Sequence, residues 1–417
     1  MLLDVHACAA QSHPPYLFLQ PLSMANIAII GGGLGGSLCA LALRSRGLNA
    51  TIFDAGRALG GRSARSQFLA SSEPHLDQVI STLSNANLIK PWTGRFGVMG
   101  AKGGFLPLSS ISTAMAGTKN ESPTATPTTD TGDFCGFLAH ARSPIYVGTP
   151  NNSSLCTSIC ELVDVKVHLE SHVSAATHVD GKWMLQIKGG GISEAFDGVV
   201  FASHNQTLAA DAIKTLSSPP DQPEIKERLD KLSTSLGTLR SSHTSPVFTV
   251  SLQYPPAALN RVNFDAATLP ADPALQMLIR ESSKPGRDVN APHDEWTGIS
   301  TTVFAKVHLE SEVDMVTEMM VRSTARVLAP YFGNDEKNVP TPIEARAKRW
   351  GAAFTTAPLI PSTEPGEDCV GLEPWRMVIA GDYVQVKQSP GEAMAMSGLV
   401  AGEKMASWFA GDTTKRK

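Results

Sequence analysis

The sequence predicts an α/β protein of two domains, the first of them doubly wound. Residues 26–53 read as a short buried strand, a helix and a second strand, which together form a βαβ unit. The chain has 417 residues, 42% of them hydrophobic, so it can bury a sizeable core. A chain of this length exceeds what one core usually supports, and a second domain is therefore expected.

The opening unit is predicted from its periodicity and from one glycine. Residues 26–30 and 50–53 are short apolar runs typical of buried strands, and residues 35–46 have the pattern of a helix. Gly47 follows the helix, where glycine commonly ends one.

The other elements follow in order along the chain. The patterns predict a turn and helix over 144–162, strands within 163–187 with a hairpin turn at Asp180-Gly181, and a buried strand over 196–202. Residues 206–345 are expected to mix helices with strands such as 247–252. A strand over 378–380 and a long helix over 390–408 follow. Residues 116–132 are rich in Thr and Pro with almost nothing apolar, so we expect a flexible surface loop.

Charge and hydropathy exclude several classes of partner. The formal net charge is -4, and the only basic block is the tail Lys415-Arg416-Lys417. A protein without a basic patch is not expected to bind nucleic acid or an anionic membrane surface. No apolar run reaches the roughly 18 to 20 residues of a membrane span. We therefore expect a soluble intracellular protein, in the cytoplasm or the chloroplast, that acts on a small molecule.

Residues 1–23 contain no Arg or Lys and lack the features of a signal or transit peptide. They are expected to be a disordered extension, and Met24 is an alternative start. The six cysteines are scattered, and none lies in a Cys-x-x-Cys spacing. Cys156 and Cys160, four residues apart on an expected helix, are interpreted as buried thiols, and no metal site is predicted.

The turn after the first strand indicates a dinucleotide. Residues 31–36 read Gly-Gly-Gly-Leu-Gly-Gly and contain Gly-x-Gly-x-x-Gly through Gly31, Gly33 and Gly36. Such glycines let the backbone approach a pyrophosphate, and the free N–H groups of the following helix face the phosphates. Asp54 ends the second strand, where a carboxylate can accept both hydroxyls of an adenosine ribose. An acidic residue here also argues against a 2'-phosphate.

A second glycine pair follows in Gly56-Arg57-Ala58-Leu59-Gly60-Gly61-Arg62. Gly61 again allows close approach of the backbone, and Arg57 and Arg62 can neutralise phosphate through charge-assisted hydrogen bonds. Domains that bind only NAD do not need this element. It favours FAD, whose extended form runs from the first glycine loop toward the protein interior.

Near the other end, Gly381-Asp382 directly follows a buried strand and can bring a carboxylate to the ribityl chain and diphosphate. Ser389-Pro390-Gly391-Glu392 is a capping-box sequence. Two interpretations of Glu392 stay open. It stabilises the start of the helix, or it lies at a helix terminus aimed at the flavin, where the positive dipole end favours an anionic reduced form.

With these motifs the chain resembles the renalase-like branch of the FAD-dependent amine oxidase superfamily, over about residues 24–406. The narrower matches are Gln67 to Pro74 (QFLASSEP), Tyr146 to Pro150 (YVGTP), Lys284 to Arg287 (KPGR), Arg349 to Gly351 (RWG) and Ala393 to Gly398 (AMAMSG).

The resemblance implies a Rossmann-type FAD domain formed by residues 24–90, 144–205 and 346–417. It also implies a mixed-sheet α+β substrate domain formed by residues 91–143 and 206–345. FAD is expected to bind without a covalent bond. The resemblance adds Leu34, Gly35, Ala55, Val173 and Ala393 to the residues expected to bind it.

The activity that the resemblance implies is oxidation of dihydro-isomers of NAD(P)H, with electrons passing to O₂ to give hydrogen peroxide. Aromatisation of the nicotinamide ring drives hydride loss, so the protein need only bind, orient and exclude water. No catalytic residue is assigned. His204, after the strand over 196–202, is the one histidine near the expected site, and a solvent-facing loop position is the simpler interpretation.

The sequence departs from the family after Arg62, where only Ser63 to Ser66 precede Gln67 and about ten residues of an expected strand are missing. Either Gln67 to Pro74 is drawn toward the flavin, or a gap opens beside it. After Pro150, Asn151-Asn152-Ser153 replaces the family's Gly-Met-Asn. Two alternatives therefore stay open: an amine oxidase or desaturase of the same superfamily, and a flavin-binding pseudoenzyme.

Overall fold

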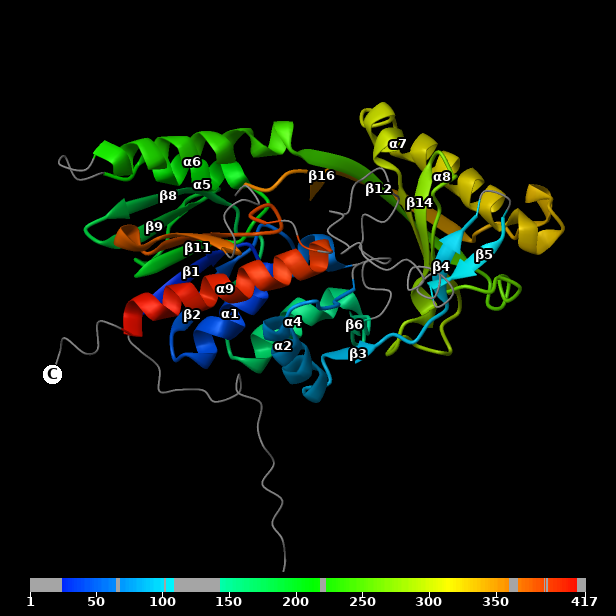
Figure 1. Ribbon diagram of the computed structural model, residues 1–417, viewed down its shortest axis with the longest axis horizontal. Coiled ribbons are helices and arrows are strands. Elements are labelled where there is room, and N and C mark those ends of the chain that lie inside the picture. The colour runs from blue at the N-terminus through cyan, green and yellow to red at the C-terminus, as the bar shows by residue number, and fades with distance from the viewer. Residues whose placement is uncertain are drawn as a thin grey trace, which may run out of the picture.

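A computed structural model describes residues 25–64, 68–100, 103–108, 143–217, 223–359, 367–385, 387 and 389–410. The expected extension over 1–23 and the expected loop over 116–132 lie outside these residues. The described chain forms two lobes, each built on one large sheet (Figure 1).

The first lobe contains a six-stranded sheet in the order β17-β18-β11-β1-β2-β7. All neighbours are parallel except β17 and β18. Its strands are β1 (Asn26–Ile30), β2 (Asn49–Phe53), β7 (Lys166–His168), β11 (Gly198–Phe201), β17 (Cys369–Leu372) and β18 (Met377–Ala380). The predicted βαβ unit is confirmed, because α1 (Leu34–Ser45) joins the parallel pair β1 and β2.

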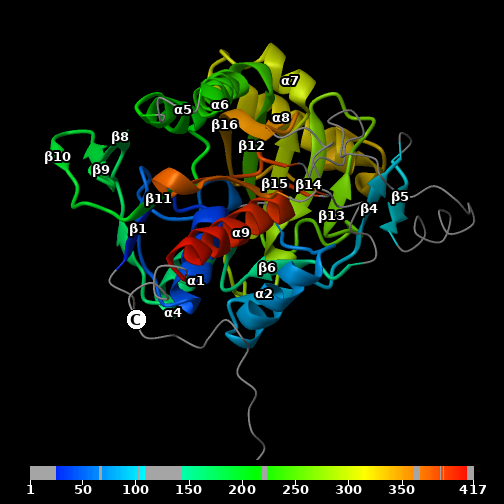
Figure 2. The ribbon, with the colours of Figure 1, turned by 60° about the vertical axis from the view of Figure 1, so that its left-hand side comes forward.

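Elements cover both faces of this sheet, which makes the lobe doubly wound as predicted. One face packs against α1, α2 (Pro74–Asn85), α4 (Asn152–Leu162) and α9 (Pro390–Ala410). The other packs against a small sheet of β8 (Val173–Val179), β9 (Lys182–Ile187) and β10 (Gly191–Ile192), and against α5 (Gln206–Lys214) and α6 (Pro223–Ser242). Figure 2 shows α9 lying along α1, with α5 and α6 on the opposite side of the sheet.

The hairpin turn predicted at Asp180-Gly181 joins β8 and β9, and both residues have positive φ angles, 50° and 75°. Two consecutive left-handed residues are what a tight hairpin turn requires.

The second lobe is built on a mixed sheet of seven strands in the order β16-β12-β15-β14-β13-β4-β5. The pair β13 and β4 is parallel, and the other neighbours are antiparallel. Its strands are β4 (Phe96–Met99), β5 (Phe105–Pro107), β12 (Thr244–Tyr254), β13 (Ala266–Thr268), β14 (Leu275–Arg280), β15 (Asp294–Ser300) and β16 (Glu344–Thr355).

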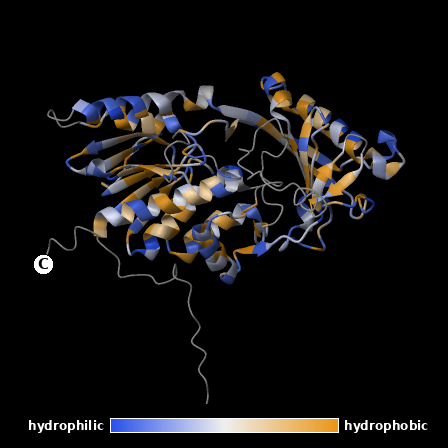
Figure 3. Ribbon diagram, in the orientation of Figure 1, coloured by the Kyte–Doolittle hydropathy of each residue, from blue (hydrophilic) through white to orange (hydrophobic). Residues whose placement is uncertain are grey.

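Two helices, α7 (Thr302–Val307) and α8 (Val313–Leu328), cover the outer face of this sheet, and the shared core includes Phe248, Val250 and Leu252. The other face of the sheet turns toward the first lobe. Figure 3 shows hydrophobic residues on the strands of both sheets and hydrophilic ones on the outer surface of α6.

Two segments differ from the expected division of the chain, and a third differs from the expected secondary structure. Residues 206–242, expected in the substrate domain, form α5 and α6 and share a core with the first sheet. Residues 344–355, of which 346–355 were expected in the FAD domain, form β16 of the second sheet. Within 144–162 a short strand, β6 (Tyr146–Gly148), precedes α4 and pairs with β3 (Ile89–Pro91). In each case the strand pairing or the shared core, which the sequence does not specify, decides the assignment.

Candidate dinucleotide-binding site

A cleft of about 440 Å³ lies along the edge of the first sheet where its parallel strands end. Ligands of open α/β sheets bind at this edge because the loops after the strands meet there. Ten residues predicted to bind the cofactor line the cleft, namely Gly31, Gly33, Leu34, Gly35, Asp54, Ala55, Gly61, Arg62, Val173 and Gly381. They come from four separate stretches of the chain, which the fold brings together.

The amino end of α1 opens into the cleft without a capping side chain. Its N-cap is Gly33, which makes no side-chain capping bond, and the first turn contains no acidic residue. The N–H groups of the first turn are therefore available to an anion, and the helix dipole favours one. Gly36 does not line the cleft. A Cβ there would overlap the carbonyl oxygen of Gly31, so this glycine permits the close turn between strand and helix.

The carboxylate of Asp54 accepts hydrogen bonds from the backbone of both glycine motifs. Its Oδ2 accepts a hydrogen bond from Gly32 N at 2.6 Å, and its Oδ1 accepts one from Gly56 N at 2.7 Å. The side chain thus joins both glycine motifs. A carboxylate has about four acceptor positions, so each oxygen can accept a further bond from a ribose hydroxyl.

Arg62 lines the cleft but is bound to Asp382. Its Nη1 and Nη2 donate to the two oxygens of Asp382 at 2.8 and 2.7 Å, and Nη1 also donates to the carbonyl of Ala353 in β16 at 2.7 Å. Burial lowers the pKa of Arg62, but Asp382 outweighs this effect and the net pKa is raised. The charge of Arg62 is therefore already balanced.

Arg57, the other predicted phosphate ligand, lies outside the cleft lining. Its side chain is 94% exposed and lies 3.7 Å from Glu170. The charge of Arg62 is balanced by Asp382, and Arg57 lies outside the cleft. The uncapped amino end of α1 is therefore the feature best placed to hold phosphates.

The segment that follows the short connection after Arg62 packs against the amino end of α9. Glu392 is fully buried, and its Oε1 accepts bonds from the backbone N and the hydroxyl of Ser72 at 2.6 and 2.7 Å. Ser389 caps the helix by accepting from Glu392 N at 3.2 Å, as the capping sequence predicts. The Glu392 carboxylate, however, binds Ser72. Neither Glu392 nor Ala393 lines the cleft.

The backbone of Phe68 covers the amino end of α9. A Cβ at Gly391 would lie 2.6 Å from the carbonyl oxygen of Phe68, so the backbone of this segment packs directly on the first turn of α9. Leu69 also exchanges two backbone hydrogen bonds with Tyr146. The described part of this segment therefore packs on α9, and none of its residues lines the cleft. Residues 65–67 lie outside the described chain.

The thiol interpretation is confirmed for Cys156 and Cys160, because both are buried and neither forms a disulfide. Burial raises the pKa of the Cys160 thiol to about 12, and its hydrogen bond to Ser37 offsets part of this effect. Across the described ranges, no three His, Cys, Asp or Glu residues gather as a metal site would require.

Several lining residues had no role in the sequence prediction, namely Ser171, His172, Ser203, Trp350, Tyr383 and Met394. His204, considered at the sequence level, also lines the cleft and is exposed. Trp350 is the only lining residue among those described that comes from the second sheet. The one sequence signal for Trp350 was its place in the family-like stretch Arg349 to Gly351.

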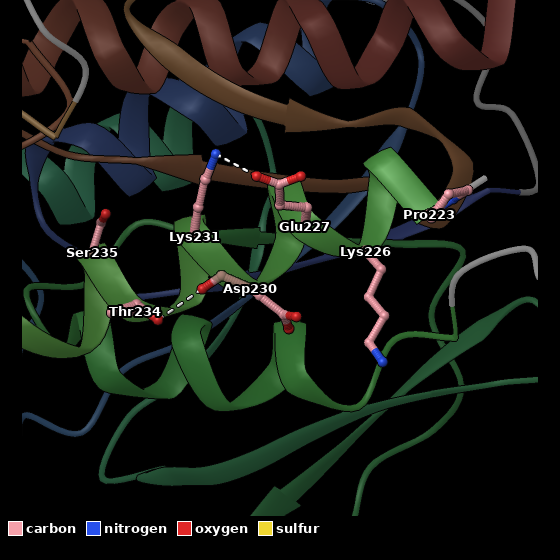
Figure 4. A pocket seen from close by; sticks show the side chains of 7 residues that line it. All are labelled: Pro223, Lys226, Glu227, Asp230, Lys231, Thr234 and Ser235. Carbon is pink, nitrogen blue, oxygen red and sulfur yellow. Dashed lines mark hydrogen bonds and ion pairs between the residues drawn. The ribbon is translucent and has the colours of Figure 1, made fainter.

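A second hollow, about 660 Å³, lies on the outer surface of α6 (Figure 4). Its lining comes from this helix and includes the ion pair of Lys231 with Glu227 at 2.7 Å. Thr234 donates to the carbonyl of Asp230 at 2.8 Å. Since ion pairs at i,i+4 are ordinary features of exposed helices, we do not assign a function to this surface.

Comparison with known proteins agrees with the fold. The family described as NAD(P)-binding Rossmann-like domain matches residues 29–87. No curated protein matches the sequence. Among the helices of the described chain, none is both long enough and apolar enough to cross a membrane.

Solved structures share the whole architecture at low identity. Putrescine oxidase bound to putrescine is 13% identical with a TM-score of 0.59, over 94% of this chain and 100% of that one. Cyclohexylamine oxidase from Brevibacterium oxydans is 16% identical with a TM-score of 0.61, over 93% and 99%. An oxidoreductase from Methanosarcina mazei is 12% identical with a TM-score of 0.58, over 89% and 99%. At these identities the likeness shows a common fold.

Proposed function

We propose that this protein is an FAD-dependent oxidoreductase that holds its cofactor without a covalent bond. The observation that carries the proposal is the cleft, in which the uncapped end of α1 and the carboxylate of Asp54 face the same edge of the sheet. The residues fit a dinucleotide, because the glycine turn leaves room for a backbone approach and Asp54 keeps acceptor capacity for a ribose.

The strand order supports the direction in which the cofactor lies. Asp54 follows β2, Gly31 follows β1 and Gly381 follows β18, and these strands stand in the order β18-β11-β1-β2. With the adenosine at Asp54 and the diphosphate at α1, the flavin end extends toward Gly381 and the second sheet. FAD when bound supplies an acceptor for hydride and a route for electrons to O₂.

The residues of the chain would then bind and orient. Arg62 is fixed by Asp382 and by β16, so the loop that contains Gly61 keeps its place beside the flavin end. Trp350 and Met394 line that end and would exclude water from it. Exclusion of water strengthens electrostatic interactions with a bound ring.

For the substrate, we propose a dihydro-isomer of NAD(P)H, with hydrogen peroxide as the product from O₂. This rests on the renalase-like stretches of the sequence and on the absence of an acid and base pair among the described lining residues of the flavin end. A hydride donor that becomes aromatic needs orientation more than proton transfer. Amine oxidation is the second candidate, because two proteins that share the fold are named for amines.

The test begins with the visible spectrum of the purified protein. We expect a flavin spectrum, and acid precipitation should release the yellow colour into the supernatant. Peroxide release is then measured with isomers of NADH and with putrescine. Peroxide from the isomers alone supports the proposal, and peroxide from putrescine alone replaces it with amine oxidation. A colourless protein that gains no spectrum from added FAD contradicts the cofactor, whereas colour without turnover indicates a flavin-binding pseudoenzyme.

A second experiment addresses the shortened stretch after Arg62. We expect FAD to bind well while oxidation is slow, because misplacement by about 1 Å can cost on the order of a hundredfold in rate. Inserting the family's missing strand between Arg65 and Ser66 should raise turnover with little change in FAD affinity. Equal rates of flavin reduction in the natural and the repaired protein would show that the short connection is harmless.

A further inference from the structure

Tyr383 is a buried tyrosine in the loop that follows β18, close after Gly381 in the sequence. The residue lines the cleft and is only 1% exposed. Its hydroxyl has no hydrogen-bond partner among the residues that the structure describes. A buried hydroxyl without a partner destabilises a protein, so native structures contain few of them and each one calls for a physical reason.

The loop after β18 fixes the side chain of Tyr383 in place. The carbonyl of Tyr383 accepts a hydrogen bond from Leu359 N at 2.7 Å, and Val384 N donates to the carbonyl of Gly381 at 3.1 Å. A Cβ at Gly381 would overlap the ring of Tyr383, so glycine lets the ring pack directly on this turn. The ring belongs to the same core as β11 and β18. The hydroxyl is therefore held beside the cleft and cannot turn out into solvent.

The charged groups beside Tyr383 are occupied with each other. Arg62 donates from both terminal nitrogens to the two oxygens of Asp382. Burial, and after it the charge of Asp382, raises the pKa of Tyr383 well above its ordinary value, and Arg62 offsets part of this effect. The phenol therefore keeps its proton and is a hydrogen-bond donor at every working pH.

The side chains that share this end of the cleft with Tyr383 supply donors rather than acceptors. The guanidinium of Arg62 has no acceptor atom, and the indole nitrogen of Trp350 is a donor that already binds Thr249 at 3.1 Å. The sulfur of Met394 is a weak acceptor and lies 4.0 Å from Arg62 Nη2. A ligand in the cleft can provide the acceptor that these side chains do not.

The strand order indicates which part of a dinucleotide reaches Tyr383. Neighbouring strands of a sheet lie about 4.8 Å apart. β18 stands two strands from β1, which leads into α1, and three strands from β2, which ends at Asp54. The end of β18 is therefore about 10 Å from the expected diphosphate site and about 14 Å from Asp54. A hydrogen bond spans about 3 Å, so the part within reach is the flavin, whose carbonyl oxygens, ring nitrogens and ribityl hydroxyls are acceptors.

We propose that Tyr383 is a cofactor-binding residue whose hydroxyl donates a hydrogen bond to the flavin moiety of bound FAD. The proposal deepens the proposed function and rests on it, since it assigns a further residue of the same site. It also explains why a buried hydroxyl is kept without a partner in the protein. The hydroxyl then contributes to FAD binding and contributes nothing to the stability of the apoprotein, which distinguishes it from an ordinary buried tyrosine.

The test is Tyr383→Phe, which removes the hydroxyl and keeps the ring. Dissociation constants for FAD and for ADP are measured by calorimetry on the full-length apoprotein. We expect the constant for FAD to rise about 2- to 12-fold, the factor that corresponds to one neutral hydrogen bond. ADP carries the adenosine and the diphosphate without the flavin. It should bind the variant and the natural protein equally.

Thermal unfolding gives a second readout on the same samples. Without FAD, Tyr383→Phe should unfold at the same temperature as the natural protein or at a higher one, because it loses an unpaired hydroxyl. Added FAD should raise the unfolding temperature of the natural protein by more than that of the variant. Tyr331→Phe is the matched control, because the Tyr331 hydroxyl donates to Asn263 Oδ1 at 2.7 Å in the second lobe. This control should leave FAD affinity unchanged and should not raise the unfolding temperature.

Three results would overturn the proposal. Equal dissociation constants for FAD would show that the hydroxyl does not contact the cofactor. An equal loss for ADP and FAD would place the hydroxyl at the diphosphate. A lower unfolding temperature of the variant without FAD would show that the hydroxyl already has a partner, such as a buried water molecule. Failure of the proposed function is seen separately, because the natural protein would then bind no FAD before any variant is compared.

Discussion

At the scale of single residues, the candidate site depends on side chains that bind the backbone. Asp54 accepts bonds from Gly32 and Gly56 and so holds the two glycine motifs together. Under the proposed function the same carboxylate accepts ribose hydroxyls, so one residue would both shape the turn and bind the ligand. Replacing Asp54 should therefore lower both the affinity for FAD and the stability of the apoprotein.

We predict that Asp54→Ala weakens FAD binding about 10- to 150-fold, because hydrogen bonds to an ionised carboxylate contribute about 1.5 to 3 kcal/mol. Fluorescence titration of the apoprotein with FAD measures the change. The apoprotein should also unfold at a lower temperature, since two backbone N–H groups lose their acceptor. Asp230→Ala is the control, because Asp230 is exposed within the helix α6. An unchanged titration curve would reject the assignment of Asp54.

The buried thiols give a dependence of stability on pH. Burial raises the pKa of Cys160 and of Cys369 to about 12. In the unfolded chain a thiol ionises near pH 8.5. The folded state therefore keeps protons that the unfolded state loses, and this stabilising contribution is lost as pH rises above about 8.5.

We predict that the free energy of unfolding falls between about pH 8 and about pH 10, by up to about 1.4 kcal/mol per pH unit for each such thiol. Urea unfolding at several pH values measures the slope. Cys160→Val removes one titrating thiol from an apolar site, so its slope should be smaller than that of the natural protein. Equal slopes would mean that Cys160 ionises normally in the folded state.

At the scale of elements, the first lobe depends on close contact between α1 and α9. A Cβ at Gly398 would overlap the carbonyl oxygen of Gly35, and a Cβ at Gly402 would lie 2.6 Å from the carbonyl oxygen of Cys39. Small residues one turn apart on α9 let the two backbones approach. This contact positions the amino end of α1, and with it the edge of the cleft.

We predict that Gly398→Ala lowers the free energy of unfolding by about 1 to 3 kcal/mol, because the added methyl group forces the helices apart. Gly237→Ala is a matched control with the opposite sign. Gly237 lies within α6 with nothing within 4 Å of an added Cβ, so alanine should stabilise that helix by about 0.5 to 1 kcal/mol. Chemical denaturation measures both. A neutral Gly398→Ala would show that the helices can separate without cost.

At the scale of the whole molecule, Arg62 links the two lobes. It extends from the loop after the second glycine motif, binds Asp382 at the end of β18 and donates to Ala353 of the second sheet. The Asp382 side chain is only 4% exposed, and that of Arg62 is 18% exposed. Removing one partner of such a pair leaves the other charge buried and unpaired.

We predict that Arg62→Met destabilises the protein by about 3 to 5 kcal/mol, since it strands the Asp382 carboxylate. Adding Asp382→Asn to the same chain should restore part of the loss, because it removes the unpaired charge. A double-mutant cycle on thermal unfolding gives the coupling between the two residues. Additive losses would show that Arg62 and Asp382 are not energetically coupled.

The sequence alone determined the elements whose signals are local. The strand β1, the helix α1, the turn at Asp180-Gly181 and the long helix α9 follow from apolar periodicity and from glycines that the backbone geometry requires. Motifs with fixed spacing likewise predicted six of the residues that line the cleft, and the resemblance added Leu34, Gly35, Ala55 and Val173.

Tertiary structure decided what depends on pairing between distant segments. Residues 206–242 join the first lobe because their apolar faces fit its sheet, and β16 joins the second sheet because β12 offers it a partner. Glu392 binds Ser72 because the chain after Arg62 folds back on α9. Trp350 reaches the cleft from the other sheet. Some of these contacts join residues far apart in the sequence, 320 positions for Ser72 and Glu392. No local pattern specifies which of many apolar or polar partners the fold will bring together.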